Sequence, residues 1–310
     1  MSGEAAILAR CPWGIKAGLS MQPGVPAIAS PMWHAVEWSN WIVTSDEGPQ
    51  ALFLKVLEPD LAGIIDVQAA HAGALAGAAA GVAPAVEFFS AQDQAIGFAY
   101  LAAPWRSAWL DDLQKPDVMA GAIAAKKAFR QSAPLARIWD VFAEVEAWVA
   151  RATASGTALP SDMPALLDAV REAGKAIDAA GKDLAPCHND GQASNLLLGP
   201  EGEVWLCDFD CAGQADPIYD LAVLLNEAYA FEADWRQGIE MQDGACHDSV
   251  LNRCRIYGLA DDLLWGLAGL VLSHTSPRRG LEFLKYGEWR LLRARMALRD
   301  PGFAARYKKL

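Results

Sequence analysis

The segment 188–210 constrains the fold of this chain more than any other part of the sequence. It contains two short apolar runs, 195–198 and 204–206, separated by the turn-forming tetrapeptide Gly-Pro-Glu-Gly at 199–202. Apolar runs on either side of a Gly/Pro turn predict a β-hairpin. Because a hairpin reverses the chain, the polar residues before its first strand are expected to lie beside those after its second strand.

Three oxygen-bearing side chains occupy the ends of this hairpin, namely Asp190, Asn195 and Asp208. Phosphoryl transfer depends mainly on positioning and charge neutralisation: Mg²⁺ bridges phosphate oxygens, and one carboxylate accepts the proton of the substrate hydroxyl group. We therefore interpret Asp190 as the proton acceptor, and Asn195 and Asp208 as ligands of Mg²⁺.

The order of the motifs extends this pattern. His188-Asn189-Asp190 is followed by Asn195, by Cys207-Asp208-Phe209-Asp210, and by Asp216-Pro217-Ile218-Tyr219-Asp220. This arrangement resembles the aminoglycoside phosphotransferase and choline/ethanolamine kinase superfamily, and the HND form of the first motif is closer to the bacterial choline kinase branch. The resemblance implies an α+β, protein-kinase-like fold with a small β-rich N-lobe and a larger, mainly helical C-lobe. It also implies ATP and Mg²⁺ as cofactors.

The resemblance further assigns roles to the residues around these three. His188 would orient the loop by hydrogen bonding without taking part in proton transfer, which differs little from the role of a satisfied core histidine. Asp210 would hold a second Mg²⁺ and ranks after Asp208 as a metal ligand. Asp220 would cap the loop or tie it from below.

A second hairpin is predicted in the N-terminal third of the chain. The apolar runs 41–43 and 51–54 flank the polar turn 45–49, and Lys55 ends the second run. By the resemblance, Lys55 would contact the α- and β-phosphates of ATP. The alternative is an ordinary surface lysine at the end of a strand.

The helix that would supply an acidic partner to this lysine departs from the family pattern, because the usual glutamate is missing. Gln68 is the expected substitute and would orient Lys55 through a neutral hydrogen bond, which is weaker than a charge-assisted one. Asp66 is the alternative partner.

The predicted phosphate-covering loop is a second departure. It keeps Ser39 and Asn40, which are expected to contact the nucleotide, but it has no glycine over 34–37. Side chains there, Glu37 above all, are expected to hinder the close approach of the backbone to phosphate that glycine permits. Both departures favour weak nucleotide affinity or a pseudokinase as an alternative to an active enzyme.

Residues 99–103 are expected to form the hinge strand that contacts adenine, with Pro104-Trp105 as the turn that leaves it. We place the domain boundary there. Residues 1–102 would form the nucleotide-binding lobe, and residues 103–310 the catalytic and substrate-binding lobe.

Helical patterns precede and follow this boundary. A packed helix of small residues is predicted over 72–86, ended by Gly81 and Pro84, and an amphipathic helix is predicted over 163–180. A third helix has an apolar stripe at one-face spacing: Ile138, Val141, Phe142, Val145, Trp148 and Val149. We interpret this stripe as core.

The C-terminal third contains the residues expected to bind the acceptor. By the resemblance, Glu227 supplies a carboxylate, and Trp265 and Tyr286 belong to the aromatic group that encloses a quaternary ammonium. A cation gains about 0.5–2 kcal/mol from each good aromatic contact, so such a cage suits a cationic head group. Aromatic residues at helical spacing are also common in cores, which is the alternative.

The aromatic group is incomplete, because Ala268 stands where the family has its second tryptophan. Trp289 and Tyr257 are the candidates to fill the gap. Without either of them, the pocket would be larger and the acceptor a different amino alcohol.

Composition excludes some classes of partner. The chain has 26 basic and 38 acidic side chains, a net charge of −12, and no basic stripe, which disfavours nucleic acids and anionic membrane surfaces. The 15-residue apolar tract at 72–86 is too short to span a bilayer, so no membrane insertion is expected. The six cysteines form no CxxC pair and no signal segment opens the chain, which predicts reduced thiols and a cytoplasmic location. The oligomeric state is left open.

These observations predict an ATP-dependent O-phosphotransferase that acts on a small, cationic hydroxyl acceptor, most readily choline or a related amino alcohol. An aminoglycoside or another small-molecule phosphotransferase is the first alternative. A nucleotide-binding pseudokinase without catalysis is the second.

Overall fold

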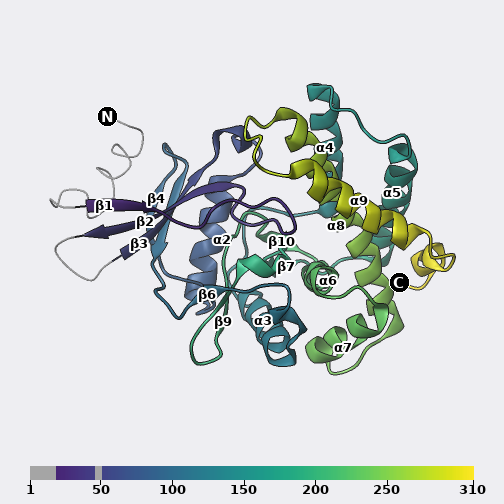
Figure 1. Ribbon diagram of the computed structural model, residues 1–310. Coiled ribbons are helices and arrows are strands. Elements are labelled where there is room, and N and C mark those ends of the chain that lie inside the picture. The colour runs from purple at the N-terminus through teal and green to yellow at the C-terminus, as the bar shows by residue number, and fades with distance from the viewer. Residues whose placement is uncertain (1–18, 46–50) are drawn as a thin grey trace.

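The computed structural model of this protein describes residues 19–45 and 51–310, and it has a sheet at one end and a large helical part at the other (Figure 1). The N-terminal sheet has five antiparallel strands in the order β1-β2-β3-β5-β4. Their bounds are β1 Leu19–Pro23, β2 Trp38–Ser45, β3 Ala51–Leu57, β4 Val86–Ser90 and β5 Ala95–Ala99. This arrangement confirms the expected β-rich N-terminal part.

Strands β2 and β3 form the hairpin predicted in the N-terminal third of the chain, with Trp41 opposite Leu54. Most of its predicted turn, residues 46–50, lies outside the described residues. The register places Asn40 opposite Lys55, so both side chains lie on one face of the sheet, because residues directly opposite in antiparallel strands share a face.

Helix α2, Val67–Ala79, packs beside this sheet and starts five residues before the predicted 72–86 helix. Its start is set by Asp66, whose carboxylate accepts hydrogen bonds from the backbone N–H groups of Gln68 and Ala69 at 3.0 Å each. The helix ends before Gly81, which has a φ of 72°, and Val86 already belongs to β4. A Cβ atom at Gly77 would lie 2.6 Å from Cζ of Phe209, so a small residue there lets the helix approach the segment 207–210.

The C-terminal part is mainly helical, as predicted. Its helices are α3 Pro116–Phe129, α4 Val141–Ser155, α5 Met163–Ala180, α6 Pro217–Ala228, α7 Glu232–Asp243, α8 Asp248–Thr275 and α9 Phe283–Leu298. Its short strands are β6 Arg106–Ser107, β7 Ala185–Cys187, β8 Leu196–Leu198, β9 Val204–Leu206 and β10 Gly213–Ala215. Strands β8 and β9 pair antiparallel, which confirms the hairpin that precedes the Asp208 segment. The domain boundary between residues 102 and 103 stays a prediction.

Two helix predictions have different outcomes. The helix over 163–180 coincides with α5. The stripe that began at Ile138 was wrong at its first member: α4 starts at Val141 behind the N-cap Asp140, whose carboxylate accepts from the backbone N–H of Phe142. Ile138 precedes the helix and is 68% exposed, so it is not a core residue.

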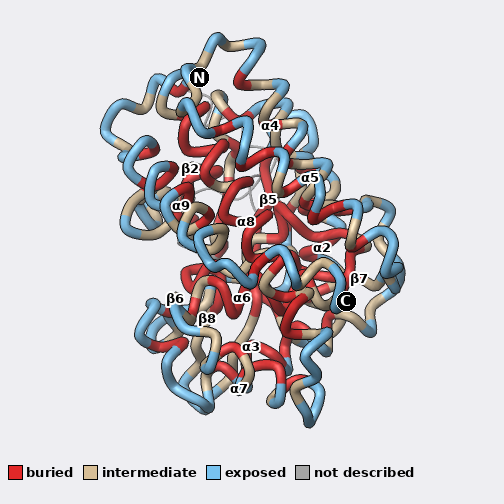
Figure 2. Tube along the Cα trace, turned by 90° about the vertical axis from the view of Figure 1, so that its right-hand side faces the viewer, coloured by how far each residue is buried: buried red, intermediate tan, exposed pale blue. Residues whose placement is uncertain are grey.

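Helix α8 is the central helix of the C-terminal part and packs against α4, α6 and α9. By length and composition it is long and apolar enough to cross a membrane, but 89% of its apolar window is buried inside the fold. The buried segments, red in Figure 2, run through the middle of the molecule along α8 and into the sheet. This core supports the loops that form the site described below.

Candidate active site

The loop 188–195 follows β7 and carries the predicted proton acceptor. Asn189 has a φ of 63° and donates through Nδ2 to the carbonyl oxygens of Cys187 and Cys211, at 3.2 and 3.0 Å. Its side chain therefore stabilises a backbone conformation that asparagine tolerates better than most residues. A Cβ atom at Gly191 would collide with the Val223 carbonyl group of α6, so the loop lies directly on that helix.

Asp190 is held by two hydrogen bonds. Its Oδ1 accepts from the backbone N–H of Gln192 at 2.7 Å, and its Oδ2 accepts from Nδ2 of Asn195 at 3.0 Å. Burial raises the pKa of the Asp190 carboxyl to about 7. A fixed carboxylate with a pKa near neutrality suits a group that must accept a proton and release it again.

His188 is the first residue of this loop, and its ring contacts backbone oxygens. Its Nε2 is 2.9 Å from the Cys207 carbonyl oxygen, and its Nδ1 is 3.3 Å from the Asp190 carbonyl oxygen. Burial lowers the pKa of His188 to about 4, so the ring is neutral at pH 7. These contacts to backbone oxygens are the ones that an orienting residue makes.

A buried ion pair supports the loop from below. Asp220 on α6 accepts from the backbone N–H of Asn189 at 2.8 Å and from Nζ of Lys126 at 2.6 Å. Lys126 also donates to the Asp190 carbonyl oxygen at 2.8 Å. Asp220 thus ties the loop as expected, whereas Lys126 escaped the sequence analysis. The available signal was a lysine on the apolar face of α3, three residues after Ile123.

Lys55 pairs with Asp208 at 2.8 Å, and both side chains are about one-tenth exposed. Burial alone would raise the pKa of Asp208, but the Lys55 ammonium outweighs it and lowers the pKa. The expected partner Gln68 is exposed on α2, and the alternative Asp66 caps that helix. Both of those predictions are corrected, because Gln68 lies on the exposed side of α2, Asp66 is used as its N-cap, and Asp208 takes the acidic role.

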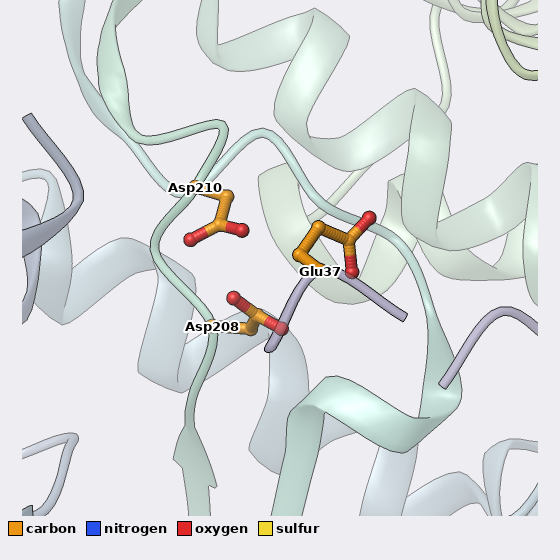
Figure 3. Close-up of side chains that lie close together, drawn as sticks. All are labelled: Glu37, Asp208 and Asp210. Atoms are coloured by element: carbon orange, nitrogen blue, oxygen red, sulfur yellow. The ribbon is translucent and has the colours of Figure 1, made fainter. Parts of the chain in front are cut away.

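Three carboxylates gather where this pair meets the catalytic segment. Oxygen atoms of Glu37, Asp208 and Asp210 lie within 4.8 Å of one another, with Glu37 coming from the N-terminal part (Figure 3). Asp208 has a φ of 62°, and Asp210 accepts from Nε1 of Trp38 at 2.8 Å. Burial raises the pKa of Asp210 well above its usual range, and the negative Asp208 beside it adds to the shift.

This donor set fits Mg²⁺, which prefers carboxylate and amide oxygens. Asn195 donates its amide nitrogen to Asp190, so its amide oxygen is the atom left to bind a cation. Asp208 and Asp210 supply carboxylates on the same segment. A bound cation would also remove the repulsion that raises the pKa of Asp210.

Glu37 has a different position from the one expected. It was predicted to obstruct the phosphate-covering loop, but its side chain is buried among the acidic group and its residue is only 8% exposed. Burial and the nearby Asp208 raise the pKa of Glu37 to about 7. The loop itself keeps a glycine-like conformation at Ala35, which has a φ of 51° and lines the cleft.

A cleft of about 410 Å³ leads to this group from the sheet. Its apolar end is lined by Ile42, Phe53, Phe98, Tyr100 and Leu101, and its polar end by Asn40, Lys55, Asn195 and Asp208. The division suits a ligand with an aromatic base at one end and phosphates at the other.

Two N-terminal predictions are changed by this geometry. Ser39 is not among the residues that line the cleft; its hydroxyl group donates to Glu58 at 2.6 Å, since side chains alternate along β2 and Asn40 takes the cleft side. The expected hinge strand over 99–103 is also corrected: β5 ends at Ala99, and Tyr100 and Leu101 reach the cleft from an irregular segment.

The two aromatic residues predicted to hold the acceptor, Trp265 and Tyr286, both pack against Trp33. The ring of Trp33, from the N-terminal part, lies 5.3 Å from that of Trp265 and 5.0 Å from that of Tyr286 between ring centroids. Trp289 packs on the outer side of Tyr286 at 5.9 Å. Tyr257 is remote and donates to Asp216. Of the two candidates named for the gap at Ala268, Tyr257 was therefore wrong, Trp289 contacts only Tyr286 of the predicted pair, and the ring that contacts both Trp265 and Tyr286 is that of Trp33.

Glu227 lies between the catalytic loop and a second depression. It accepts a backbone hydrogen bond from Ala193, and its carboxylate is 3.9 Å from the buried guanidinium of Arg290. It also lines a groove of about 900 Å³ together with Trp109, Trp289 and Asp111. Burial raises the pKa of Glu227 despite the neighbouring arginine.

Replacing Lys55 by methionine should raise the KM for Mg-ATP by at least about tenfold, since the change removes the only ammonium among the described residues that line the cleft and leaves Asp208 without its partner. Steady-state kinetics at saturating acceptor would measure it. Lys175→Met is the matched control, because Lys175 is 74% exposed and pairs only with Glu172. An unchanged KM in Lys55→Met would show that this lysine does not contact the nucleotide.

Comparison with known proteins identifies relatives of this architecture. The sequence pattern of a family described as the phosphotransferase enzyme family matches residues 33–257. A protein of Deinococcus radiodurans is 51% identical, but only over 45 residues, which span 14% of this chain and 13% of that protein.

Solved structures match along nearly the whole chain. A choline/ethanolamine kinase family protein from Mesorhizobium loti is 21% identical, with a TM-score of 0.79 and coverage of 99% of this chain and 97% of that one. The choline kinase LicA from Streptococcus pneumoniae is 17% identical, with a TM-score of 0.75 and coverage of 96% and 99%. An aminoglycoside phosphotransferase, APH(2")-IIa, solved with streptomycin and ATP, is 15% identical, with a TM-score of 0.55 and coverage of 88% and 90%. At these identities the likeness establishes the shared two-part kinase-like fold.

Proposed function

Because the chain belongs to the phosphotransferase enzyme family, we propose that it transfers the γ-phosphoryl group of Mg-ATP to the hydroxyl group of a small molecule, with choline or a related amino alcohol as the preferred acceptor. One observation carries this proposal. Lys55, Asp208 and Asn195 meet at the polar end of one cleft, and Asn195 is hydrogen-bonded to Asp190. That set supports phosphoryl transfer, which depends mainly on positioning and charge neutralisation.

The proposed reaction uses the cleft along its length. The base of the nucleotide binds at the apolar end near Tyr100, and Lys55 contacts the phosphates. Asn195, Asp208 and Asp210 would hold Mg²⁺, which neutralises charge on the phosphate oxygens. Asp190 accepts the proton of the acceptor hydroxyl group while the oxygen of that hydroxyl group forms a bond to the γ-phosphorus. The bond between the γ-phosphorus and the β–γ bridging oxygen breaks, and ADP leaves.

The choice of an amino alcohol rests on the acceptor side. Glu227 lies within hydrogen-bonding distance of the loop that carries Asp190, and Trp265 and Tyr286 provide aromatic faces. A carboxylate and aromatic faces together favour a cation. The choline/ethanolamine kinase family protein from Mesorhizobium loti and the choline kinase from Streptococcus pneumoniae share the fold. Their names support the same class of acceptor.

A larger acceptor is the second candidate. The groove bounded by Glu227 and Asp111 has a volume of about 900 Å³, which is more than choline needs, and its two carboxylates would suit a polycationic aminoglycoside. A silent nucleotide-binding protein is the remaining alternative, and it predicts Mg-ATP binding without any phosphorylated product.

The test is ADP release from Mg-ATP with choline, ethanolamine or an aminoglycoside, with the Asp190→Asn variant as the blank. Choline-dependent turnover that the variant lacks would support the proposal. Turnover with an aminoglycoside alone would favour the second candidate. Mg-ATP binding without turnover on any acceptor would contradict catalysis.

A further inference from the structure

Trp33 occupies the centre of the aromatic group expected to bind the acceptor. Its residue is 4% exposed, and its ring centroid lies 5.3 Å from that of Trp265, 5.6 Å from that of Phe283 and 5.0 Å from that of Tyr286. The other three rings come from α8 and α9, whereas Trp33 comes from the segment that precedes β2. We call Trp265, Phe283 and Tyr286 the aromatic box.

The box has no space for a cation while Trp33 is in it. An ammonium group binds over an aromatic face, within about 6 Å of the ring centroid, and it needs its own volume between the rings. At centroid separations of 5.0–5.6 Å and interplanar angles of 46–54°, the indole of Trp33 packs against all three rings. The indole therefore fills the volume that a cationic head group would use.

Hydrogen bonds hold both the side chain and the backbone of Trp33. Its Nε1 donates to Oε1 of Glu37 at 2.5 Å, and its carbonyl oxygen accepts from the Ser194 hydroxyl group at 3.1 Å. Three residues after Trp33, the Val36 carbonyl oxygen accepts a hydrogen bond from Arg278 at 2.7 Å. These bonds connect Trp33 to the acidic group and to the catalytic loop, so its position is defined by both halves of the site.

We propose that Trp33 determines acceptor specificity by competing with the cationic head group for the aromatic box, an inference that rests on the proposed function. An acceptor must displace the indole before its head group can enter. The free energy needed to displace the indole makes the binding of every quaternary ammonium less favourable. Removing the indole should open the box and leave the Glu37 carboxylate free to face the cation.

The test uses tetramethylammonium, which has no hydroxyl group and so reports on the box without any phosphoryl transfer. Isothermal titration of the Trp33→Ala variant should give a Kd at least about tenfold lower than that of the unaltered protein. Trp33→Leu, which keeps more apolar volume, serves as a second variant if Trp33→Ala does not fold, and it should show a smaller gain in the same direction. Thermal unfolding of each variant establishes that it is folded.

Two controls sharpen the result. Phe231→Ala removes an aromatic residue that is 74% exposed and lines neither the cleft nor the groove, so the Kd of that variant should not change. The uncharged isostere of choline, 3,3-dimethylbutan-1-ol, should gain much less affinity in the Trp33 variants than tetramethylammonium does.

An equal or weaker affinity of the folded Trp33 variants for tetramethylammonium would overturn the proposal, because Trp33 would then be a wall that contacts the cation. An equal gain for the uncharged isostere would also overturn it, because the opened space would be only an apolar cavity. Neither readout depends on turnover, so a failed phosphoryl-transfer assay would contradict the proposed function and not this inference.

Discussion

The Asp190→Asn variant is expected to lose about 10²- to 10⁴-fold in kcat while keeping its fold. The amide has nearly the same shape as the carboxylate, and its oxygen still accepts from the backbone N–H of Gln192, but it cannot take the proton of the acceptor hydroxyl group. ADP release at saturating Mg-ATP and acceptor measures the loss, and thermal unfolding establishes that the variant is folded.

Asp183→Asn is the matched control for this experiment. Asp183 is exposed in the segment before β7, and the same chemical change there should leave kcat unchanged. Retained turnover in a folded Asp190→Asn variant would rule out Asp190 as the proton acceptor.

The Lys126→Met variant should lose about 3–5 kcal/mol of unfolding free energy, as expected when one partner of a buried ion pair is removed. The side chains of Lys126 and Asp220 are 1% and 0% exposed and 2.6 Å apart, so the change leaves an uncompensated carboxylate in the core. Turnover should fall as well, because Lys126 also donates to the Asp190 carbonyl oxygen. Urea unfolding measures the stability.

The double variant Lys126→Met/Asp220→Asn should recover a substantial part of that stability. The neutral amide at position 220 needs no counter-charge, and the amide oxygen can still accept from the backbone N–H of Asn189. For comparison, Lys175→Met removes only an exposed pair and should change stability by less than about 1 kcal/mol. A Lys126→Met variant as stable as Lys175→Met would show that the buried pair does not support the loop.

Local pattern was enough to predict the frame of the site. The hairpin β8–β9, helix α5 and the loop that carries Asp190 depend on turn residues and periodicity over short stretches, which a sequence displays directly. The meeting of Asp190 and Asn195 follows from that frame, since the two residues are five positions apart in one loop.

The direction in which a side chain points within a correctly predicted element was harder to predict from the sequence. Ser39 and Gln68 lie in the predicted elements, yet one turns toward Glu58 and the other toward solvent. Which face of β2 or α2 meets the cleft depends on how the element packs, and a shift of one position moves a side chain to the opposite face.

The sequence by itself predicted the hairpins, helix α5 and the spacing of the loop that carries Asp190, because these arise from interactions between near neighbours in the chain, and the resemblance of its motifs to a known family implied the two-part kinase-like fold. Only the tertiary structure decided that Asp208 pairs with Lys55, that Glu37 joins the acidic group, and that Lys126 lies beneath the loop. It alone decided that Trp33 fills the aromatic box. These contacts join segments far apart in sequence, and the partner of each side chain is set by the volume and charge that packing leaves at that point.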